Sequence, residues 1–137
     1  MKPTLRPGIE RVKTIPIGSD RAISFMGDDS RTYATPSMIR DIEHTCRELI
    51  LEHANAGEDS VGMEVAVKHL APTLMGMTAE IRVRVSAVEG RRVSFSATVR
   101  DELDEVGTGT HTRFVIDKNK TLERLQAKAA RFAALAR

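Results

Sequence analysis

Residues 35–50, TPSMIRDIEHTCRELI, form the stretch of the chain that decides the fold. Thr35 is a good N-cap, and Pro36 suits the first helical position, where its missing N–H costs nothing. Gly57 supplies a stop signal. The side chains at helical spacing are Met38, Ile39, Ile42, Cys46, Leu49, Ile50 and His53. This pattern predicts one long amphipathic helix.

After the turn at residues 57–60, the spacing of the apolar residues changes from the helical period to a period of two. Met63, Val65, Val67 and His69 then share one face of a strand, and similar alternation recurs further along the chain. The expected strands are, in chain order, 11–17, 63–69, 81–86, 93–99 and 106–116. A helix followed by strands joined by short turns predicts an α+β fold in which an antiparallel sheet wraps one long central helix.

The 137 residues are expected to form a single domain. Residues 1–10 contain several breakers and are predicted to be a tail. Residues 118–137 carry apolar side chains at helical spacing and predict a C-terminal amphipathic helix with a basic outer face. In the last strand, Gly107 and Gly109 would let another backbone or a helix approach closely.

Composition argues against several classes of protein. Hydrophobic residues make up 41% and charged residues 29%, and the net charge is only +2. No apolar run reaches the roughly 18 residues that span a bilayer, and the start of the chain lacks a signal-peptide core. Scattered charge and few aromatics argue against a nucleic-acid partner. The single cysteine, Cys46, suits a cytoplasmic protein. The histidines make no metal-ligand pattern, so no metal is expected.

Three polar residues occupy positions where an apolar side chain is expected or where a helix begins. Thr35 precedes the helical run, Glu43 falls in the apolar stripe, and His69 falls on the apolar face of the following strand. Each has an ordinary explanation: a helix cap, a carboxylate reaching out from the edge of the stripe, and a hydrogen-bonded core histidine. Together, however, a hydroxyl, a carboxylate and an imidazole indicate acyl transfer or hydrolysis.

The spacing of these residues resembles the fluoroacetyl-CoA thioesterase family. The resemblance covers roughly residues 33–116. It is carried by Ala34-Thr35 with Glu43 eight positions after Thr35, Gly62 with His69, VEGRR at 88–92, and DEVGTGTHTR at 104–113. It implies a hot-dog fold, a homodimer, and hydrolysis of a short acyl-CoA thioester without a cofactor, since CoA is part of the substrate.

The resemblance also assigns roles to residues. It implies that Thr35, Glu43 and His69 are catalytic, and it gives substrate contacts to the backbone N–H of Gly62 and to Arg113. Tyr33, at the end of the region before the helix, is expected to contact the substrate as well. Residues 25–33 are shorter than the Phe-rich lid of the fluoroacetyl enzyme, so fluoroacetyl selectivity does not follow from the resemblance.

Two mechanisms and a second function remain open on the sequence alone. Thr35 attacks the thioester with His69 as base and Glu43 orienting the imidazole, or Glu43 or His69 activates water while Thr35 positions the substrate. Pro36 offers no N–H, so the oxyanion donors are expected at Ser37 onward and at Gly62. The alternative function is a non-catalytic hot-dog module that binds acyl-CoA or a small acid. An enoyl-thioester hydratase is a weaker third option.

Overall fold

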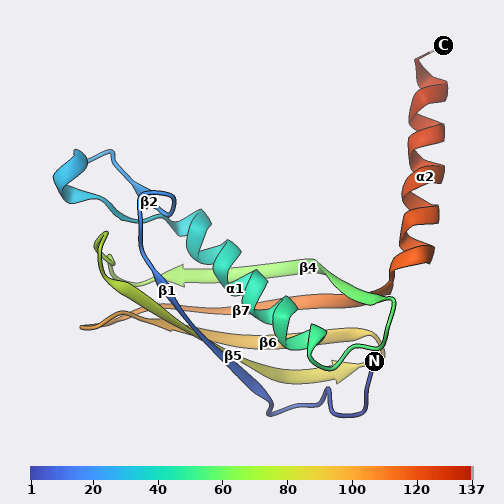
Figure 1. Ribbon diagram of the computed structural model, residues 1–137, viewed down its shortest axis with the longest axis horizontal. Helices are drawn as coiled ribbons and strands as arrows, with labels where there is room; N and C mark the ends of the chain where they lie inside the picture. Colours follow the sequence, from blue (N-terminus) through green and yellow to red (C-terminus); the bar gives the residue numbers. More distant parts are fainter. Residues whose placement is uncertain (137) are drawn as a thin grey trace.

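The computed structural model describes residues 1–136, which form a five-stranded antiparallel sheet, a short hairpin and two α-helices. In chain order the elements are β1 (Glu10–Pro16), β2 (Ala22–Ile23), the 3-10 turn η1 (Asp28–Ser30), β3 (Thr32–Tyr33), α1 (Thr35–Leu51), β4 (Glu58–His69), β5 (Thr78–Glu89), β6 (Arg92–Arg100), β7 (Glu105–Asp117) and α2 (Lys118–Leu135). The strand order in the large sheet is β1-β5-β6-β7-β4, and β2 pairs with β3 outside it. Figure 1 shows α1 lying across one face of this sheet.

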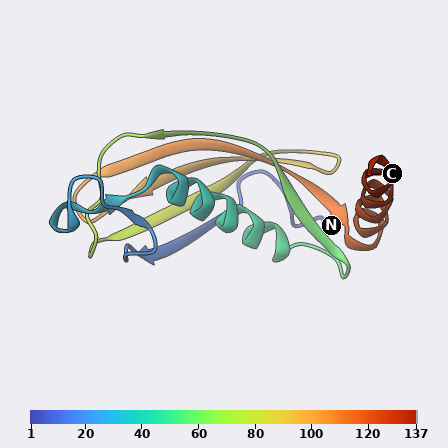
Figure 2. The ribbon, with the colours of Figure 1, turned by 90° about the horizontal axis from the view of Figure 1, so that it is seen from above.

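Helix α1 fills the concave side of the sheet, which curves over it in Figure 2. Its buried residues are Met38, Asp41, Ile42, Thr45, Cys46, Leu49 and Ile50. The apolar members of this set remove their surface from water against the inner side chains of the strands, the main driving force for the arrangement. Burial also raises the pKa of the Cys46 thiol to about 12, so it packs as a small apolar group. The predicted α+β architecture is confirmed.

Both predicted ends of α1 need correction. Ala34, with φ −75° and ψ 138°, is the N-cap, and Thr35 and Pro36 are the first two helical residues. The Thr35 hydroxyl does not cap the helix because it is hydrogen-bonded to His69 instead. At the other end the helix stops at Leu51, several residues before Gly57.

The inner face of the sheet follows the predicted alternation on β5 and β6. Ile81, Val83 and Val85 are fully buried, and Phe95 and Val99 lie beside them on the next strand. Strand β4 departs from the pattern because its register with β7 shifts between Gly62 and Glu64. This bulge inserts Met63, which is consequently exposed and does not share the inner face as predicted.

The two glycines of β7 make the close approaches that the sequence predicted. A Cβ atom at Gly107 would lie 2.7 Å from Sδ of Met38, and one at Gly109 would lie 2.6 Å from the carbonyl oxygen of Ala66. Both distances are too short for real atoms. Glycine at these two positions therefore lets α1 and β4 pack against β7.

The N-terminal residues are not a loose tail. Leu5 is buried in the core, the Lys2 N–H donates to His53 O at 2.7 Å, and the Gly8 N–H donates to Val85 O at 2.8 Å. The breakers bend the segment, but the burial of Leu5 and these backbone bonds hold it against the end of α1 and the edge of the sheet.

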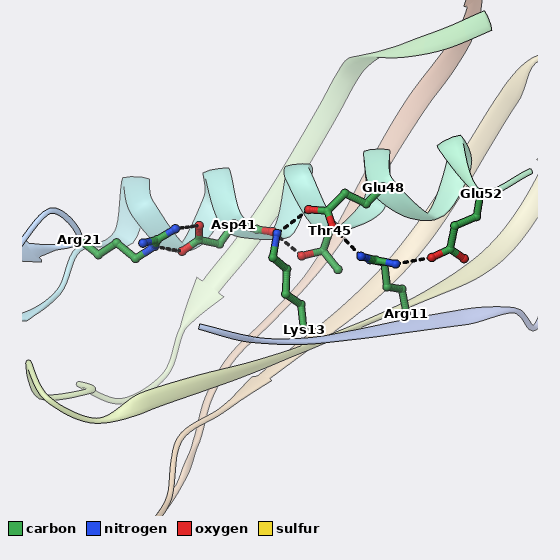
Figure 3. A network of polar contacts seen from close by, with 7 residues as sticks. All are labelled: Arg11, Lys13, Arg21, Asp41, Thr45, Glu48 and Glu52. Atoms are coloured by element: carbon green, nitrogen blue, oxygen red, sulfur yellow. Dashed lines mark hydrogen bonds and ion pairs between the residues drawn. The ribbon is translucent and has the colours of Figure 1, made fainter. Parts of the chain in front are cut away.

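Strand β1 is joined to α1 by charged side chains. Arg11 and Lys13 both reach Glu48, and Arg11 also reaches Glu52 (Figure 3). These groups are partly exposed, so each pair contributes modestly to stability, about 1 kcal/mol or less.

Helix α2 stands away from the body of the molecule (Figure 1). The Asp117 carboxylate caps it by accepting from the Lys120 N–H at 3.0 Å. None of its residues 118–135 is buried, and its apolar side chains, including Leu125 and Phe132, are exposed. Neither helix of residues 1–136 is long and apolar enough to cross a bilayer.

Candidate active site

Two of the three predicted catalytic residues meet at one end of the groove between α1 and β4. Thr35 is the first residue of α1, and His69 is the last residue of β4. The Thr35 Oγ lies 2.7 Å from His69 Nδ1. Thr35 is exposed and His69 half-buried, so the pair is accessible from solvent. Together with Ile23, Tyr33 and Leu70 they line a cavity of about 280 Å³.

The His69 imidazole is suited to accept a proton. Burial lowers its pKa below the ordinary value of 6.5, so the ring is neutral near pH 7. If Nδ1 accepts from the Thr35 hydroxyl, Nε2 carries the ring proton. The Nε2 atom is buried and has no hydrogen-bond partner within residues 1–136. The backbone of Ala71 nevertheless lies close enough to the ring to oppose the effect of burial on its pKa, so the imidazole is surrounded by its own chain.

Glu43, the third predicted residue, does not join this pair. It lies eight residues after Thr35 on the same helix, a separation of about 12 Å along the axis. Its half-buried side chain lines a second cavity, also of about 280 Å³, with Gly62, Glu64, Val65 and His111. Within one chain, Glu43 therefore adjoins the predicted substrate contact Gly62 and not the Thr35–His69 pair.

A buried cation lies directly behind Gly62. Arg113 is 6% exposed and donates to Ser60 Oγ at 2.7 Å, to Ser60 O at 2.9 Å and to His111 Nε2 at 3.1 Å. These three acceptors carry no negative charge, and burial lowers the pKa of the guanidinium. A Cβ on Gly62 would lie 3.3 Å from His111 Cε1 and 3.6 Å from Arg113 Nη1, so the backbone of Gly62 adjoins both side chains. The negative charge of Glu43 opposes this lowering of the pKa, so the carboxylate in the adjoining cavity partly balances the buried guanidinium.

His111 fixes the direction of the Arg113 contact, a role that the sequence did not indicate. Its Nδ1 lies 2.7 Å from the carbonyl oxygen of Glu64, which can only accept. Nδ1 therefore carries the proton and Nε2 accepts from Arg113. Burial, opposed by the Glu64 bond, lowers the pKa of His111, in keeping with a neutral ring.

An apolar stretch separates the two ends of the groove. Ile39 lies midway between Thr35 and Glu43 on the helix, and Val65 and Val67 lie midway between Gly62 and His69 on β4. These three side chains belong to the lining of a cavity of about 790 Å³ along the β4 edge. The groove is thus polar at both ends and apolar between them, as expected for a site that holds a thioester with a small acyl chain.

Tyr33 borders the cavity of the Thr35–His69 pair, but its hydroxyl points away from it. The ring is 1% exposed, and Oη donates to Asp41 Oδ2 at 2.5 Å. Only the ring edge is available on the cavity side. Asp41, a buried carboxylate one turn before Thr45 on α1, was not anticipated from the sequence.

The two buried imidazoles predict a decrease in stability with acid. Because burial lowers the pKa of His69 and of His111 in the folded protein, the unfolded chain binds protons first as the pH falls. The free energy of unfolding should be constant at neutral pH and fall as the pH drops below about 6.5, until the folded-state pKa values are passed. Urea unfolding between about pH 7.5 and 5.5 measures this, since carboxyl groups titrate lower. A flat or rising curve in that range would contradict it.

Comparison with known proteins identifies the family. The model for the fluoroacetyl-CoA-specific thioesterase family matches residues 17–119, which include Thr35, Glu43, Gly62, His69 and Arg113. The fluoroacetyl-CoA thioesterase of Streptantibioticus cattleyicolor is 36% identical over 96 residues, which are 70% of this chain and 66% of that relative.

Solved structures agree with the fold. A Thermus thermophilus protein of the thioesterase superfamily is 28% identical, with a TM-score of 0.89 over 98% of this chain and 99% of that one. The fluoroacetyl-CoA thioesterase FlK is also 28% identical, with a TM-score of 0.81 over 90% of this chain and 96% of that one. The sheet wrapped around α1 is the hot-dog fold, and the chain belongs to the fluoroacetyl-CoA-specific thioesterase family of thioester hydrolases.

Proposed function

We propose that this protein hydrolyses the thioester of a small acyl-CoA to the free acid and CoA. The contact of 2.7 Å between Thr35 Oγ and the neutral imidazole of His69, at the open end of an apolar groove, is the observation that carries the proposal. The relatives support the choice of substrate class, because point mutants of FlK have been solved in complex with acetyl-CoA and with fluoroacetate and CoA. No cofactor is needed, and the single buried cysteine fits a cytoplasmic enzyme.

In the proposed mechanism Thr35 is the nucleophile. As its Oγ attacks the carbonyl carbon, its proton passes to His69 Nδ1. The C–S bond then breaks and the thiolate of CoA takes that proton. Water hydrolyses the resulting Thr35 ester, with His69 again accepting and returning the proton. Donors for the oxyanion come from the first turn of α1 and, in the dimer described next, from the N–H of Gly62 of the partner subunit, because Pro36 has none.

The complete site in this proposal requires a homodimer. Strand β4 is an edge strand whose exposed Met63 and neighbouring backbone can pair with a second copy. If two β4 strands pair antiparallel about a twofold axis at Ala66, Val67 lies opposite Val65 of the partner subunit, and His69 lies opposite the bulge at Gly62 of the partner subunit. Glu43 of the partner subunit, which adjoins that glycine, then approaches the cavity of the Thr35–His69 pair.

The acyl group is expected to be small. This expectation rests on the family, whose model is that of a fluoroacetyl-CoA-specific thioesterase. The region before α1 carries exposed Phe25 and Met26 at a hairpin that turns outward, and we do not assign fluoroacetyl selectivity to it.

A hydrolysis screen tests the proposal. Acyl-CoA substrates from acetyl and fluoroacetyl to long chains are supplied, and the released thiol is measured. Short acyl groups should give the highest kcat/KM. If the protein bound acyl-CoA but released no thiol, the proposed enzymatic function would be rejected in favour of a non-catalytic acyl-CoA-binding module.

Replacement of Thr35 tests the covalent route. Thr35→Ser should keep much of the activity because a hydroxyl remains, while Thr35→Ala should lower kcat by at least about 100-fold. Rapid-quench mass spectrometry should find an acyl adduct on Thr35 in the wild type. Since the side chain makes no capping bond, Thr35→Ala should leave the helix stable. Full activity of a folded Thr35→Ala variant would leave water as the nucleophile.

A further inference from the structure

Asp41 is a buried carboxylate with a complete set of partners near the proposed catalytic pair. It is 3% exposed on α1. Arg21 donates to both of its oxygens, with Nε 3.0 Å from Oδ2 and Nη2 3.2 Å from Oδ1, and Tyr33 Oη donates to Oδ2 at 2.5 Å. Figure 3 shows the guanidinium of Arg21 reaching the Asp41 carboxylate from the chain that precedes the helix. Asp41 is thus the point at which that chain is fixed to α1.

The segment fixed in this way leads directly to Thr35. Arg21 adjoins β2, Tyr33 ends β3, and these two strands pair with each other. Two backbone bonds complete the attachment: the Ala34 N–H donates to Arg21 O at 2.8 Å, and the Tyr33 N–H donates to Thr73 O at 2.8 Å. The ring of Tyr33 is therefore set by its neighbours and by a bond at its tip.

The same ring supports His69. The ring centroids of Tyr33 and His69 are 6.4 Å apart with an interplanar angle of 73°, an edge-to-face contact. Burial, together with the bond to Asp41, raises the pKa of the Tyr33 hydroxyl, so it remains a proton donor to the carboxylate. Asp41, Tyr33 and His69 form a chain of contacts that ends at the imidazole bonded to Thr35.

We propose that Tyr33 and Asp41 are positioning residues, in which Asp41 fixes the Tyr33 ring and the ring holds His69 in the orientation that presents Nδ1 to Thr35. This inference rests on the proposed function. His69 is the last residue of β4, and its imidazole is held by contacts with the Ala71 backbone and with the ring of Tyr33. A misplacement of about 1 Å at a reacting group lowers a rate by about 100-fold, so such support matters to the chemistry.

A purely structural role is a weaker explanation for these side chains. A buried ion pair is often no more stabilising than apolar residues of similar volume, because both charges lose water. Position 41 faces the core between Met38 and Thr45, where an apolar side chain would pack. The arrangement instead gives Tyr33 one fixed orientation, which is the property that a neighbouring catalytic imidazole requires.

Kinetics of Tyr33→Phe and Asp41→Asn test the inference in the full-length protein. Tyr33→Phe keeps the ring and removes only its tether. It should lower kcat about 10-fold while KM changes less than about twofold, because the substrate still binds but His69 is less well oriented. Looser packing admits water to the imidazole, so the acid limb of kcat should move toward the ordinary histidine pKa of 6.5. Asp41→Asn, which retains a weaker acceptor, should change both quantities in the same direction.

Thr45→Val is the matched control. The Thr45 hydroxyl is buried on the same helix and donates to Asp41 O at 2.7 Å, but it does not touch Tyr33 or His69. Its loss should lower the melting temperature and leave kcat and the acid limb unchanged. The double variant Tyr33→Phe/Asp41→Asn should lose no more activity than the less active of the two single variants, because both changes break the same chain of contacts.

Titration of His69 by nuclear magnetic resonance gives a readout independent of turnover. A raised His69 pKa in folded Tyr33→Phe is the expected result. Unchanged kcat and unchanged His69 titration in that variant would overturn the positioning role, even if stability falls as in Thr45→Val. Absence of thioesterase activity in the wild type would refute the proposed function instead, and the titration would still decide whether Tyr33 and Asp41 position His69.

Discussion

His69→Ala is expected to lower kcat by about two or more decades, the scale of losing a general base. The structure supplies the reason: the Thr35 hydroxyl lies 2.7 Å from His69 Nδ1, which can accept its proton, and burial keeps that ring neutral. Glu43→Gln should cause a loss of similar size, since it removes the charge and keeps the volume. Release of CoA thiol from the best short substrate, at saturating concentration, measures both effects.

The chain contains a control of the same chemistry. His53 Nδ1 also lies 2.7 Å from a threonine hydroxyl, that of Thr4. This second pair lies just beyond the C-terminal end of α1, whereas Thr35 begins the helix. His53→Ala removes an equivalent hydrogen bond and should leave kcat within about twofold of the wild type, as for a surface change. If His69→Ala also retained near-normal turnover with an intact fold, the assignment of the catalytic pair would be rejected.

Local periodicity was enough to predict the parts of the site that lie on regular elements. The helical pattern around Met38 and Ile42 and the alternation along β5 and β6 follow directly from one-sided burial, and both are present in the structure. The elements that these patterns predict place Thr35 at the start of α1 and His69 at the end of β4, and the two side chains meet there. The hot-dog fold implied by the family resemblance is confirmed.

The features missed by the sequence depend on contacts between distant segments. Asp41 gave no local signal, because its burial results from a hairpin that brings Arg21, twenty residues earlier, over the helix. The Thr35 hydroxyl was expected to cap α1, but a histidine 34 residues later takes it. Likewise, Leu5 anchors the predicted tail only because β1 and the end of α1 form a surface for it. Such contacts are determined by tertiary packing and produce no periodic pattern in the amino-acid sequence.

The distance between Glu43 and the Thr35–His69 pair leads to the second large prediction. If the site combines residues of two chains, two inactive variants should restore each other. In a heterodimer of His69→Ala with Glu43→Gln, one site carries both substitutions and the other carries neither. Purified heterodimers should therefore show about half of the wild-type activity per dimer, although each homodimer has lost about two or more decades.

The experiment needs chains with two different affinity tags, co-expressed and purified through both. Two controls define the limits: a heterodimer of wild type with the double variant His69→Ala/Glu43→Gln, and each single homodimer. If Glu43 instead served His69 of its own chain, every site in the mixed heterodimer would carry one substitution and activity would stay at the homodimer level. In that case the wild-type/double-variant heterodimer would retain about half of the activity, whereas with a shared site it would retain almost none, since each of its sites would hold one altered residue. The two heterodimers thus give opposite results under the two arrangements. The separation of eight positions between Thr35 and Glu43 along α1 favours the shared site.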